Sequence, residues 1–229
     1  MRTIAFIFAR GGSKGLKNKN ILKINNIPLI AHSIILAKSI QKIDDVYVST
    51  DSELISKISK NFGAKVIKRP KYLAKDKSSE ILSWQHAIKF LLKKNIFFNV
   101  FISLPATSPL RKKADVLKCI KLLDNKTDLV ITFQKTSRSP WFNMVNRINS
   151  NSDNLKLVIE NKSKKIYRRQ DAPLIYDMTT VCYVSRPAFI INNNYLFNGN
   201  IRGVEIPKNR AIDIDDKYDY EIAKFLLEK

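Results

Sequence analysis

The sequence of 229 residues is poor in cysteine, in acidic residues and in long apolar runs, and each shortage excludes a class of protein. Its two cysteines, Cys119 and Cys182, lie far apart without zinc-type spacing, which excludes a disulfide scaffold and favours a reducing, cytoplasmic location. No apolar run approaches the roughly 20 residues that cross a bilayer, so we expect no membrane partner. The apolar start is short and runs into a glycine loop, which is typical of a buried strand and not of a signal peptide.

The shortage of acidic residues leaves 41 Lys and Arg against 20 Asp and Glu, a formal charge of +21. Such a charge is typical of proteins that bind nucleic acid or anionic membranes. The basic residues are scattered, however, with no run of five or more and no basic tail. Lys, Ile and Asn have A/T-rich codons, so genome composition accounts for the excess. We therefore expect no nucleic-acid partner. A basic nucleic-acid-binding protein, which would not be an enzyme, is kept as an alternative function.

Strand-like and helical segments alternate along the chain. Apolar runs predict strands at 4–9, 46–50, 65–67, 99–104, 128–134, 181–184 and 201–206. Helical spacing and capping residues predict helices at 28–37, 52–62, 79–94, 114–123 and 217–227. The alternation predicts an α/β fold with a mainly parallel, Rossmann-like sheet flanked by helices.

One stretch departs from this pattern. Between 137 and 177 the segments are short, polar and rich in Asn and Lys, without helical spacing. We predict a single domain over 1–229 in which 137–177 is an inserted β-type excursion that mediates dimerisation. Trp84 is expected in the core, whereas Trp141 and Phe142 are expected to pack at an interface.

The loop that follows the first predicted strand combines glycine with fixed positive charge. Glycines let the main chain approach a ligand closely, and consecutive free N–H groups bind anions. The loop has neither the G-x-x-x-x-G-K-[ST] pattern of a P-loop nor the G-x-G-x-x-G pattern of a dinucleotide site. It is either an ordinary solvated basic loop or, as we predict, a polyphosphate site formed by Gly11, Gly12, Gly15, Arg10, Lys14 and Lys19.

Other polar residues also follow predicted strands directly. Arg10, Asp51 and the segment 105–109 each come just after a strand end. In open parallel sheets, ligands gather at the carboxyl ends of the strands. We therefore expect these residues to line one crevice.

Six motifs occur in order and cover most of the chain. They are A-R-G-G-S-K-G at 9–15, S-T-D at 49–51, R-P at 69–70 followed by D-K-S-S at 76–79, T-S-P-L-R at 107–111, R-R-Q-D at 168–171, and I-D-I-D at 212–215. In these motifs the sequence resembles the acylneuraminate cytidylyltransferases, which are CMP-sialic acid and CMP-nonulosonic acid synthetases. The resemblance implies that the sheet is that of a nucleotidyltransferase.

The resemblance also implies a reaction in which the anomeric 2-hydroxyl of a 2-keto sugar acid attacks the α-phosphorus of CTP, giving the CMP-sugar and pyrophosphate. It assigns nucleotide binding to Ala9, Arg10, Gly11, Gly12, Ser13, Lys14, Lys19, Asn20, Arg69, Ser79 and Ala106. It assigns sugar binding to Thr107, Ser108, Arg169, Gln170 and Thr179, where a guanidinium suits a carboxylate. The catalytic residues that it implies are Arg10, Lys14, Lys19, Asp213 and Asp215.

Asp213 and Asp215 are also candidate metal ligands on their own spacing. Residues two apart in an extended segment point to the same side, so both carboxylates can reach one Mg²⁺. The alternative is that one of them caps the terminal helix, although Asp216 and Asp219 are available for that role. We predict Mg²⁺ as the cofactor.

Two departures from the family pattern fall on the acceptor side. Pro105 removes a side-chain amide expected near the ligand, and Thr179 stands where the family has an asparagine. We therefore expect CTP chemistry with an acceptor such as legionaminic acid, which segment 176–180 favours, or N-acetylneuraminic acid. The nearest alternatives are CMP-Kdo synthetase and other sugar nucleotidyltransferases.

Overall fold

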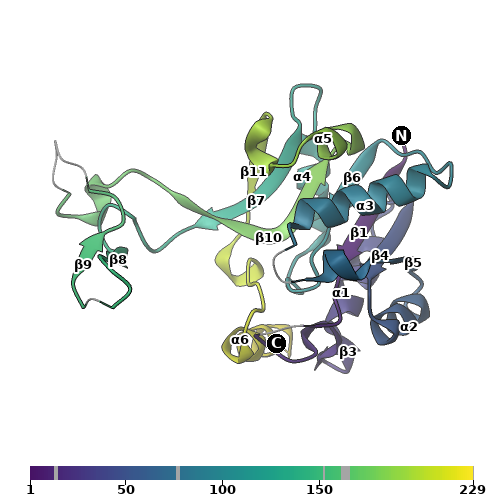
Figure 1. Ribbon diagram of the computed structural model, residues 1–229, viewed down its shortest axis with the longest axis horizontal. Coiled ribbons are helices and arrows are strands. Elements are labelled where there is room, and N and C mark those ends of the chain that lie inside the picture. The colour runs from purple at the N-terminus through teal and green to yellow at the C-terminus, as the bar shows by residue number, and fades with distance from the viewer. Residues whose placement is uncertain (13–14, 76–77, 152, 161–165, 229) are drawn as a thin grey trace. The chain divides into compact units, whose positions relative to one another are not determined.

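A computed structural model describes residues 1–12, 15–75, 78–151, 153–160 and 166–228 (Figure 1). It divides the chain into two compact units, Met1–Phe133 with Met178–Lys229, and Gln134–Asp177. The second unit begins three residues before the excursion expected at 137–177 and ends with it.

The first unit is built on a seven-stranded sheet in the order β11-β7-β10-β6-β1-β4-β5. Pairs β1–β4, β1–β6, β4–β5 and β7–β11 are parallel, and β6–β10 is antiparallel. The prediction of a mainly parallel α/β sheet is confirmed. The strands are β1 (Thr3–Phe8), β4 (Asp45–Thr50), β5 (Lys65–Lys68), β6 (Val100–Ser103), β7 (Leu129–Lys135), β10 (Tyr176–Ser185) and β11 (Ile201–Glu205).

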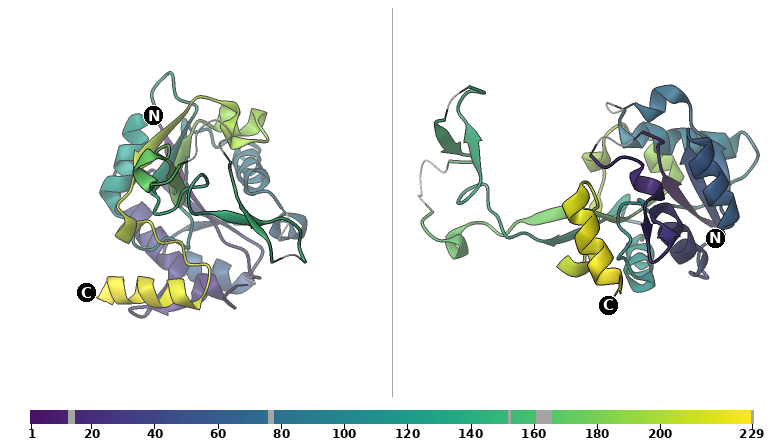
Figure 2. Two further views of the ribbon diagram at one scale, coloured as in Figure 1. Left: turned by 90° about the vertical axis from the view of Figure 1, so that its left-hand side faces the viewer. Right: turned by 90° about the horizontal axis from the view of Figure 1, so that it is seen from below.

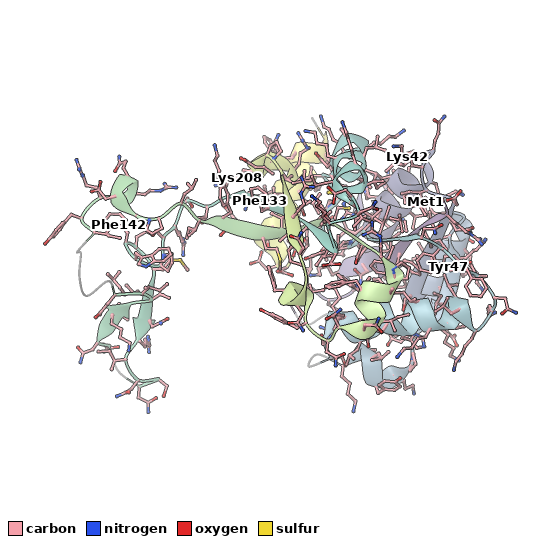
Figure 3. All side chains as sticks on the ribbon, turned by 90° about the horizontal axis from the view of Figure 1, so that it is seen from above. Met1, Lys42, Tyr47, Phe133, Phe142 and Lys208 are labelled. Carbon is pink, nitrogen blue, oxygen red and sulfur yellow. The ribbon has the colours of Figure 1, made fainter. Side chains whose placement is uncertain are left out.

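The central strand β1 is apolar on both faces because helices cover both faces of the sheet (Figure 2). Its alternate side chains enter two different cores. Ala5 and Ile7 pack with residues of α1 (Leu29–Lys38), α2 (Glu53–Asn61) and α4 (Lys113–Leu122). Ile4 and Phe6 pack with residues of α3 (Glu80–Leu92) and α5 (Pro187–Asn192). Figure 3 shows the described side chains of the whole chain on the ribbon.

Segments from near both ends of the chain form a third, smaller core. Ile24, Leu29, Ile214 and Ala223 are buried together, and Ala223 lies on the last helix, α6 (Lys217–Glu228). The two short strands β2 (Lys23–Ile24) and β3 (Ile27–Pro28) form a hairpin beside it. This core therefore connects the segment after the basic loop with the I-D-I-D motif.

The helices begin and end close to the predicted positions. Ser52 caps α2, because its Oγ accepts a hydrogen bond from the Ile55 amide at 3.3 Å. The sequence pattern missed α5, which has only six residues. It also placed the start of β10 at 181, because residues 176–178 are exposed and lack an apolar pattern. No described helix has the length and apolar character that a membrane crossing requires.

The second unit has little regular structure. An antiparallel hairpin pairs β8 (Val145–Arg147) with β9 (Leu155–Leu157), and a 3-10 turn spans Arg169–Asp171. Among its described residues, only Ser139 is buried. This unit therefore has no hydrophobic core of its own in the part that the structure describes.

Candidate active site

A cavity of about 420 Å³ opens in the first unit, where β1, β5 and β6 end. It brings together side chains that lie far apart in the sequence, as expected at the carboxyl edge of such a sheet. The residues that line it are Phe8, Arg10, Gly15, Lys19, Asn20, Arg69, Leu73, Lys75, Ser78, Glu80, Ser83, Thr107 and Asp215.

The loop after β1 is tied down at both ends. The Gly11 amide donates to Asp51 Oδ1 at 2.9 Å, so Asp51 holds the loop through its main chain. Asn20 Nδ2 donates to the Arg10 carbonyl at 3.1 Å and thereby closes the loop. A Cβ at Gly15 would lie 2.5 Å from the Asp215 carbonyl oxygen, so only glycine allows this close approach. Predicted residues Ser13 and Lys14 lie outside the described residues.

Lys19 and Asp215 form an ion pair in the cavity, with Lys19 Nζ at 2.9 Å from Asp215 Oδ1. The Lys19 side chain is mostly buried, whereas Asp215 is largely exposed. The Asp215 amide donates to Asp219 Oδ2 at 3.0 Å, which fixes its backbone. The cavity therefore presents a positioned cation with a carboxylate beside it.

Asp213 has a buried oxygen, Oδ1, with no hydrogen-bond partner. Between the two aspartates, the Ile214 amide donates to the Thr107 carbonyl at 2.9 Å, and the Ile214 side chain is fully buried in the third core. In an extended segment both neighbours of Ile214 point away from that core. A buried carboxylate oxygen without a partner, two residues before a second carboxylate, suits Mg²⁺, which takes one or two carboxylates together with other oxygens.

The alternative that Asp213 or Asp215 caps the last helix is not what the structure shows. Asp216 Oδ1 accepts from the Asp219 amide at 3.0 Å, and Asp219 Oδ2 accepts from the Asp216 amide at 3.2 Å. This reciprocal pair is a capping box at the start of α6. The carboxylates of Asp213 and Asp215 are therefore not needed as helix caps, and Asp215 lines the cavity.

Arg69 lies buried at the end of β5. Its Nε donates to Ser49 Oγ at 3.2 Å and its Nη2 to the Ser49 carbonyl at 2.8 Å, while its Cζ lies 5.6 Å from the centre of the Phe8 ring. Burial lowers the pKa of Arg69 to about 10, against the opposing charges of Asp51 and Glu80. The guanidinium therefore stays charged at neutral pH.

Glu80 lines the same cavity, although it belongs to none of the six sequence motifs. As the first residue of α3 it has the position of an ordinary acidic residue at a helix N-terminus, so no sequence signal distinguishes it. Its Oε1 accepts a hydrogen bond from Trp84 Nε1 at 3.2 Å. Solvent reaches the side chain through the cavity, yet surrounding protein desolvates the carboxylate and raises its pKa, with Asp213 adding to the rise.

Arg111 supports the segment 105–109 from behind and was also missed. It is buried, its Nη1 donates to Ser33 Oγ at 3.2 Å, and its Nη2 donates to the Pro105 carbonyl. Burial lowers its pKa to about 10, whereas the charge of Asp213 acts in the opposite direction. Arg111 thus holds in place the backbone that carries Thr107 into the cavity.

The cytidylyltransferase family model matches residues 4–224, almost the whole chain. The chain belongs to the cytidylyltransferase family. The resemblance drawn from the six motifs is thereby confirmed. The chain is 36% identical to the post-translational flagellin modification protein B of Campylobacter coli, over 97% of this chain and 94% of that protein. It is 34% identical to the CMP-N,N'-diacetyllegionaminic acid synthase of Campylobacter jejuni, over 96% of this chain and 93% of that protein.

Solved structures agree on the fold. The CMP:2-keto-3-deoxy-manno-octonic acid synthetase complexed with CTP superposes with a TM-score of 0.72 at 18% identity, covering 100% of this chain and 99% of that chain. A 4-diphosphocytidyl-2C-methyl-D-erythritol synthase gives a TM-score of 0.69 at 10% identity, covering 99% and 98%. At these identities the likeness extends to the architecture of a nucleotidyltransferase and no further.

Two predicted sugar-binding residues of this cytidylyltransferase point into the sheet. Ser108 is fully buried, with its Oγ 2.7 Å from Thr180 Oγ1. Thr179 is buried as well, and its Oγ1 donates to Thr132 Oγ1 at 2.8 Å. Both hydroxyl groups form hydrogen bonds with threonines of neighbouring strands, and neither residue is among those that line the cavity.

The remaining predicted residues are more varied in their placement. Arg69 and Thr107 line the cavity, whereas Ala106 is buried beneath it and Ser79 precedes α3 without capping it through its side chain. Arg169 and Gln170 are exposed in the second unit and line a cavity of about 340 Å³ within it. There, Arg169 Nη2 donates to the Thr136 carbonyl at 2.6 Å.

Proposed function

We propose that this cytidylyltransferase activates a nonulosonic acid with CTP, forming the CMP-sugar and pyrophosphate. The observation that carries the proposal is the cavity that joins Arg10 and Lys19 of the basic loop with Arg69 and Asp215. Relatives whose names include a CMP-legionaminic acid synthase and a pseudaminic acid cytidylyltransferase support this class of acceptor. Legionaminic acid is the acceptor that we propose first, and N-acetylneuraminic acid second.

In this proposal the cationic residues bind and orient the triphosphate. Arg10 and Lys19 lie on one wall of the cavity, where they offset the negative charge that accumulates around the α-phosphorus as the sugar hydroxyl attacks. Gly15 lets the main chain of the loop come close to Asp215 and so keeps Lys19 beside that carboxylate. Holding nucleotide and acceptor in line supplies most of the rate enhancement in such a reaction.

Asp213 and Asp215 would hold the proposed Mg²⁺. The buried, unpartnered Oδ1 of Asp213 is the observation that supports this role. When bound, Mg²⁺ neutralises phosphate charge and polarises the phosphoryl group. Lys19 positions the Asp215 carboxylate through their ion pair.

Arg169 and Gln170 are the residues that we propose for the acceptor. A guanidinium can bind the carboxylate of a sugar acid through two parallel hydrogen bonds. Arg169 is exposed, and it is anchored through one nitrogen to the Thr136 carbonyl. CMP-Kdo synthetase remains the alternative, and the structural likeness that favours it is a likeness of fold.

A homodimer formed through the second unit is part of the proposal. That unit exposes large apolar side chains, including Leu155 at 57% and Leu174 at 76%, although its described residues contain no buried apolar side chain. A unit of this size does not bury enough surface to be stable alone. A second copy of the same unit is the occupant that we propose for this apolar surface.

The proposed location is the cytoplasm. Cys119 and Cys182 are both free and buried, which fits a reducing compartment. A buried pair of free thiols needs no oxidising environment for folding.

The decisive experiment is pyrophosphate release from CTP with Mg²⁺ and a panel of nonulosonic acids, with Kdo included. The proposal predicts release with at least one nonulosonic acid, and the preferred member identifies the acceptor. Release with Kdo alone would support the alternative. No release across the panel, from protein that is folded and binds CTP, would overturn the proposed acceptor class.

A further inference from the structure

Glu80 has no role in the function proposed above, although it lines the same cavity as Arg69. The hydrogen bond from Trp84 Nε1 fixes its carboxylate, and Trp84 is itself fully buried among Phe101 and Tyr183, with ring centres 5.3 Å away in each case. The carboxylate is therefore held at the cavity wall by a rigid part of the core. A carboxylate fixed at the wall of a cavity is placed to accept a hydrogen bond from a ligand.

Arg69 and Glu80 both line this cavity. The charge of Glu80 raises the pKa of Arg69, and the charge of Arg69 lowers that of Glu80, so the two groups lie within electrostatic reach. The hydrogen bonds and ion pairs of the described residues nevertheless include no direct contact between them. Arg69 donates through Nε and Nη2 to Ser49, which leaves Nη1 for a ligand. The cavity therefore contains a hydrogen-bond donor and a hydrogen-bond acceptor that are not paired with each other.

The two groups match the hydrogen-bonding edge of cytosine. Cytosine offers two acceptors, O2 and N3, and one donor, the N4 amino group. A guanidinium only donates hydrogen bonds, and an ionised carboxylate only accepts them. In uracil the N4 amino group is replaced by a carbonyl oxygen, which a carboxylate repels, and N3 carries a proton. Arg69 and Glu80 together therefore complement cytosine and oppose uracil.

We infer that Glu80 selects the base of the nucleotide, accepting a hydrogen bond from the N4 amino group of cytosine while Arg69 donates to the acceptors of the base. Phe8 lines the same cavity, and the Arg69 guanidinium lies over its ring, with Cζ 5.6 Å from the ring centre. The inference rests on the proposed use of CTP. It assigns Glu80 to specificity for the base and gives it no part in the transfer of the nucleotidyl group.

The test is equilibrium binding of CTP and of UTP, each with Mg²⁺ and without a sugar acid, to the wild-type chain and to Glu80→Gln. Glutamine can donate as well as accept, so it serves the O4 of uracil as well as the N4 of cytosine. We expect the preference for CTP over UTP to fall by about tenfold or more, since a hydrogen bond to a charged group is replaced by one without preference. The expected cause is weaker CTP binding with unchanged or tighter UTP binding.

Glu53→Gln is the matched control. Glu53 is the first residue of α2, as Glu80 is of α3, and it is exposed, so the substitution removes the same charge from the same position of a helix. We expect the preference of this variant to equal that of the wild-type chain. Melting temperatures of all proteins establish that the variants are folded.

The possible outcomes separate the inference from the proposed function. A folded wild-type chain that binds neither nucleotide overturns the proposed function. A wild-type chain that prefers CTP, with the same preference in Glu80→Gln, overturns the role of Glu80. If Glu80→Gln weakens the binding of CTP and of UTP equally, the role is also overturned, because Glu80 then only supports the cavity through Trp84. If Glu80→Gln does not fold, Glu80→Asp takes its place: the shortened carboxylate must reduce the preference for CTP, and an unchanged preference rejects the role.

Discussion

The two units of this chain use the same kinds of residue in opposite ways. In the first unit, apolar side chains of β1, α1 and α3 are buried in two cores, one on each side of the sheet. In the second unit, the described apolar side chains stay at least partly exposed, and β8 and β9 pair with each other alone. Buried apolar side chains therefore specify the fold of the first unit, whereas we expect the second unit to need a partner that covers its apolar surface.

Tryptophan offers the strongest test of this difference, because each unit contains one of the two tryptophans of the chain. Trp84 is fully buried and Trp141 is partly exposed. We expect Trp84→Ala to lower the free energy of unfolding by about 3–5 kcal/mol through the lost packing and the cavity left behind. We expect Trp141→Ala to lower it by less, because Trp141 is only partly buried within its own chain. Urea unfolding measures both.

Equal losses from these two variants would contradict the comparison. If Trp84→Ala does not fold, Trp84→Phe and Trp141→Phe form the replacement pair, and the first must still lose more. A larger loss at Trp141 would mean that packing in the second unit, within the chain or against a second copy, contributes more to stability than the core around Trp84.

Replacing one aspartate by asparagine in each unit tests which unit contains the catalytic carboxylates. We expect Asp213→Asn to reduce turnover with CTP and Mg²⁺ by more than about 100-fold, because loss of a metal ligand removes charge that the phosphates require. Asp153→Asn makes the same change at an exposed position of the second unit and should leave turnover unchanged. Pyrophosphate release measures turnover, and unchanged melting temperatures show that the folds persist. Undiminished activity of Asp213→Asn would exclude it as a ligand.

Charge placed on the exposed apolar surface of the second unit should affect assembly. We expect Leu155→Asp with Leu174→Asp to weaken the proposed dimer by at least about tenfold, since truncation of anchor residues commonly costs that much. Light scattering coupled to gel filtration, over a range of concentrations, measures the mass. Leu54→Asp is the control, because Leu54 is 53% exposed on α2 of the first unit. A dimer that survives the double variant and dissociates in the control would reverse the assignment of the two surfaces.

The smallest expected effect is the pH dependence of stability. It concerns the first unit, because both histidines of the chain, His32 and His86, lie there. Burial lowers the pKa of His32, whose Nε2 lies 3.3 Å from the Ile24 carbonyl, and burial also lowers the pKa of His86. Below the unfolded pKa of about 6.5 the unfolded chain therefore binds more protons than the folded one, and the free energy of unfolding falls as the pH drops.

Melting temperatures at pH 7.5 and pH 5.5 test this expectation. The decrease on acidification should be smaller in His32→Asn than in the wild-type chain. An equal decrease in both would show that His32 does not contribute to the pH dependence.

Local patterns predicted most of the regular structure because they report burial. The run at 4–9 is apolar at every position, as a central strand covered on both faces must be. The exposed start of β10 and the short helix α5 carry no such pattern, and both were missed. Sequence reasoning also expected Ser108 and Thr179 at the acceptor. The hydroxyl groups of both are taken up by Thr180 and Thr132, partners that no local pattern identifies.

The sequence by itself determined the α/β class, the family and the cationic loop, because apolar periodicity and contiguous motifs are local properties of a chain. Only the tertiary structure placed β10 between β7 and β6, joined Lys19 to Asp215, and brought Glu80 and Arg69 to one cavity. These arrangements depend on contacts between residues far apart in the chain, which packing of the whole sheet and its helices decides.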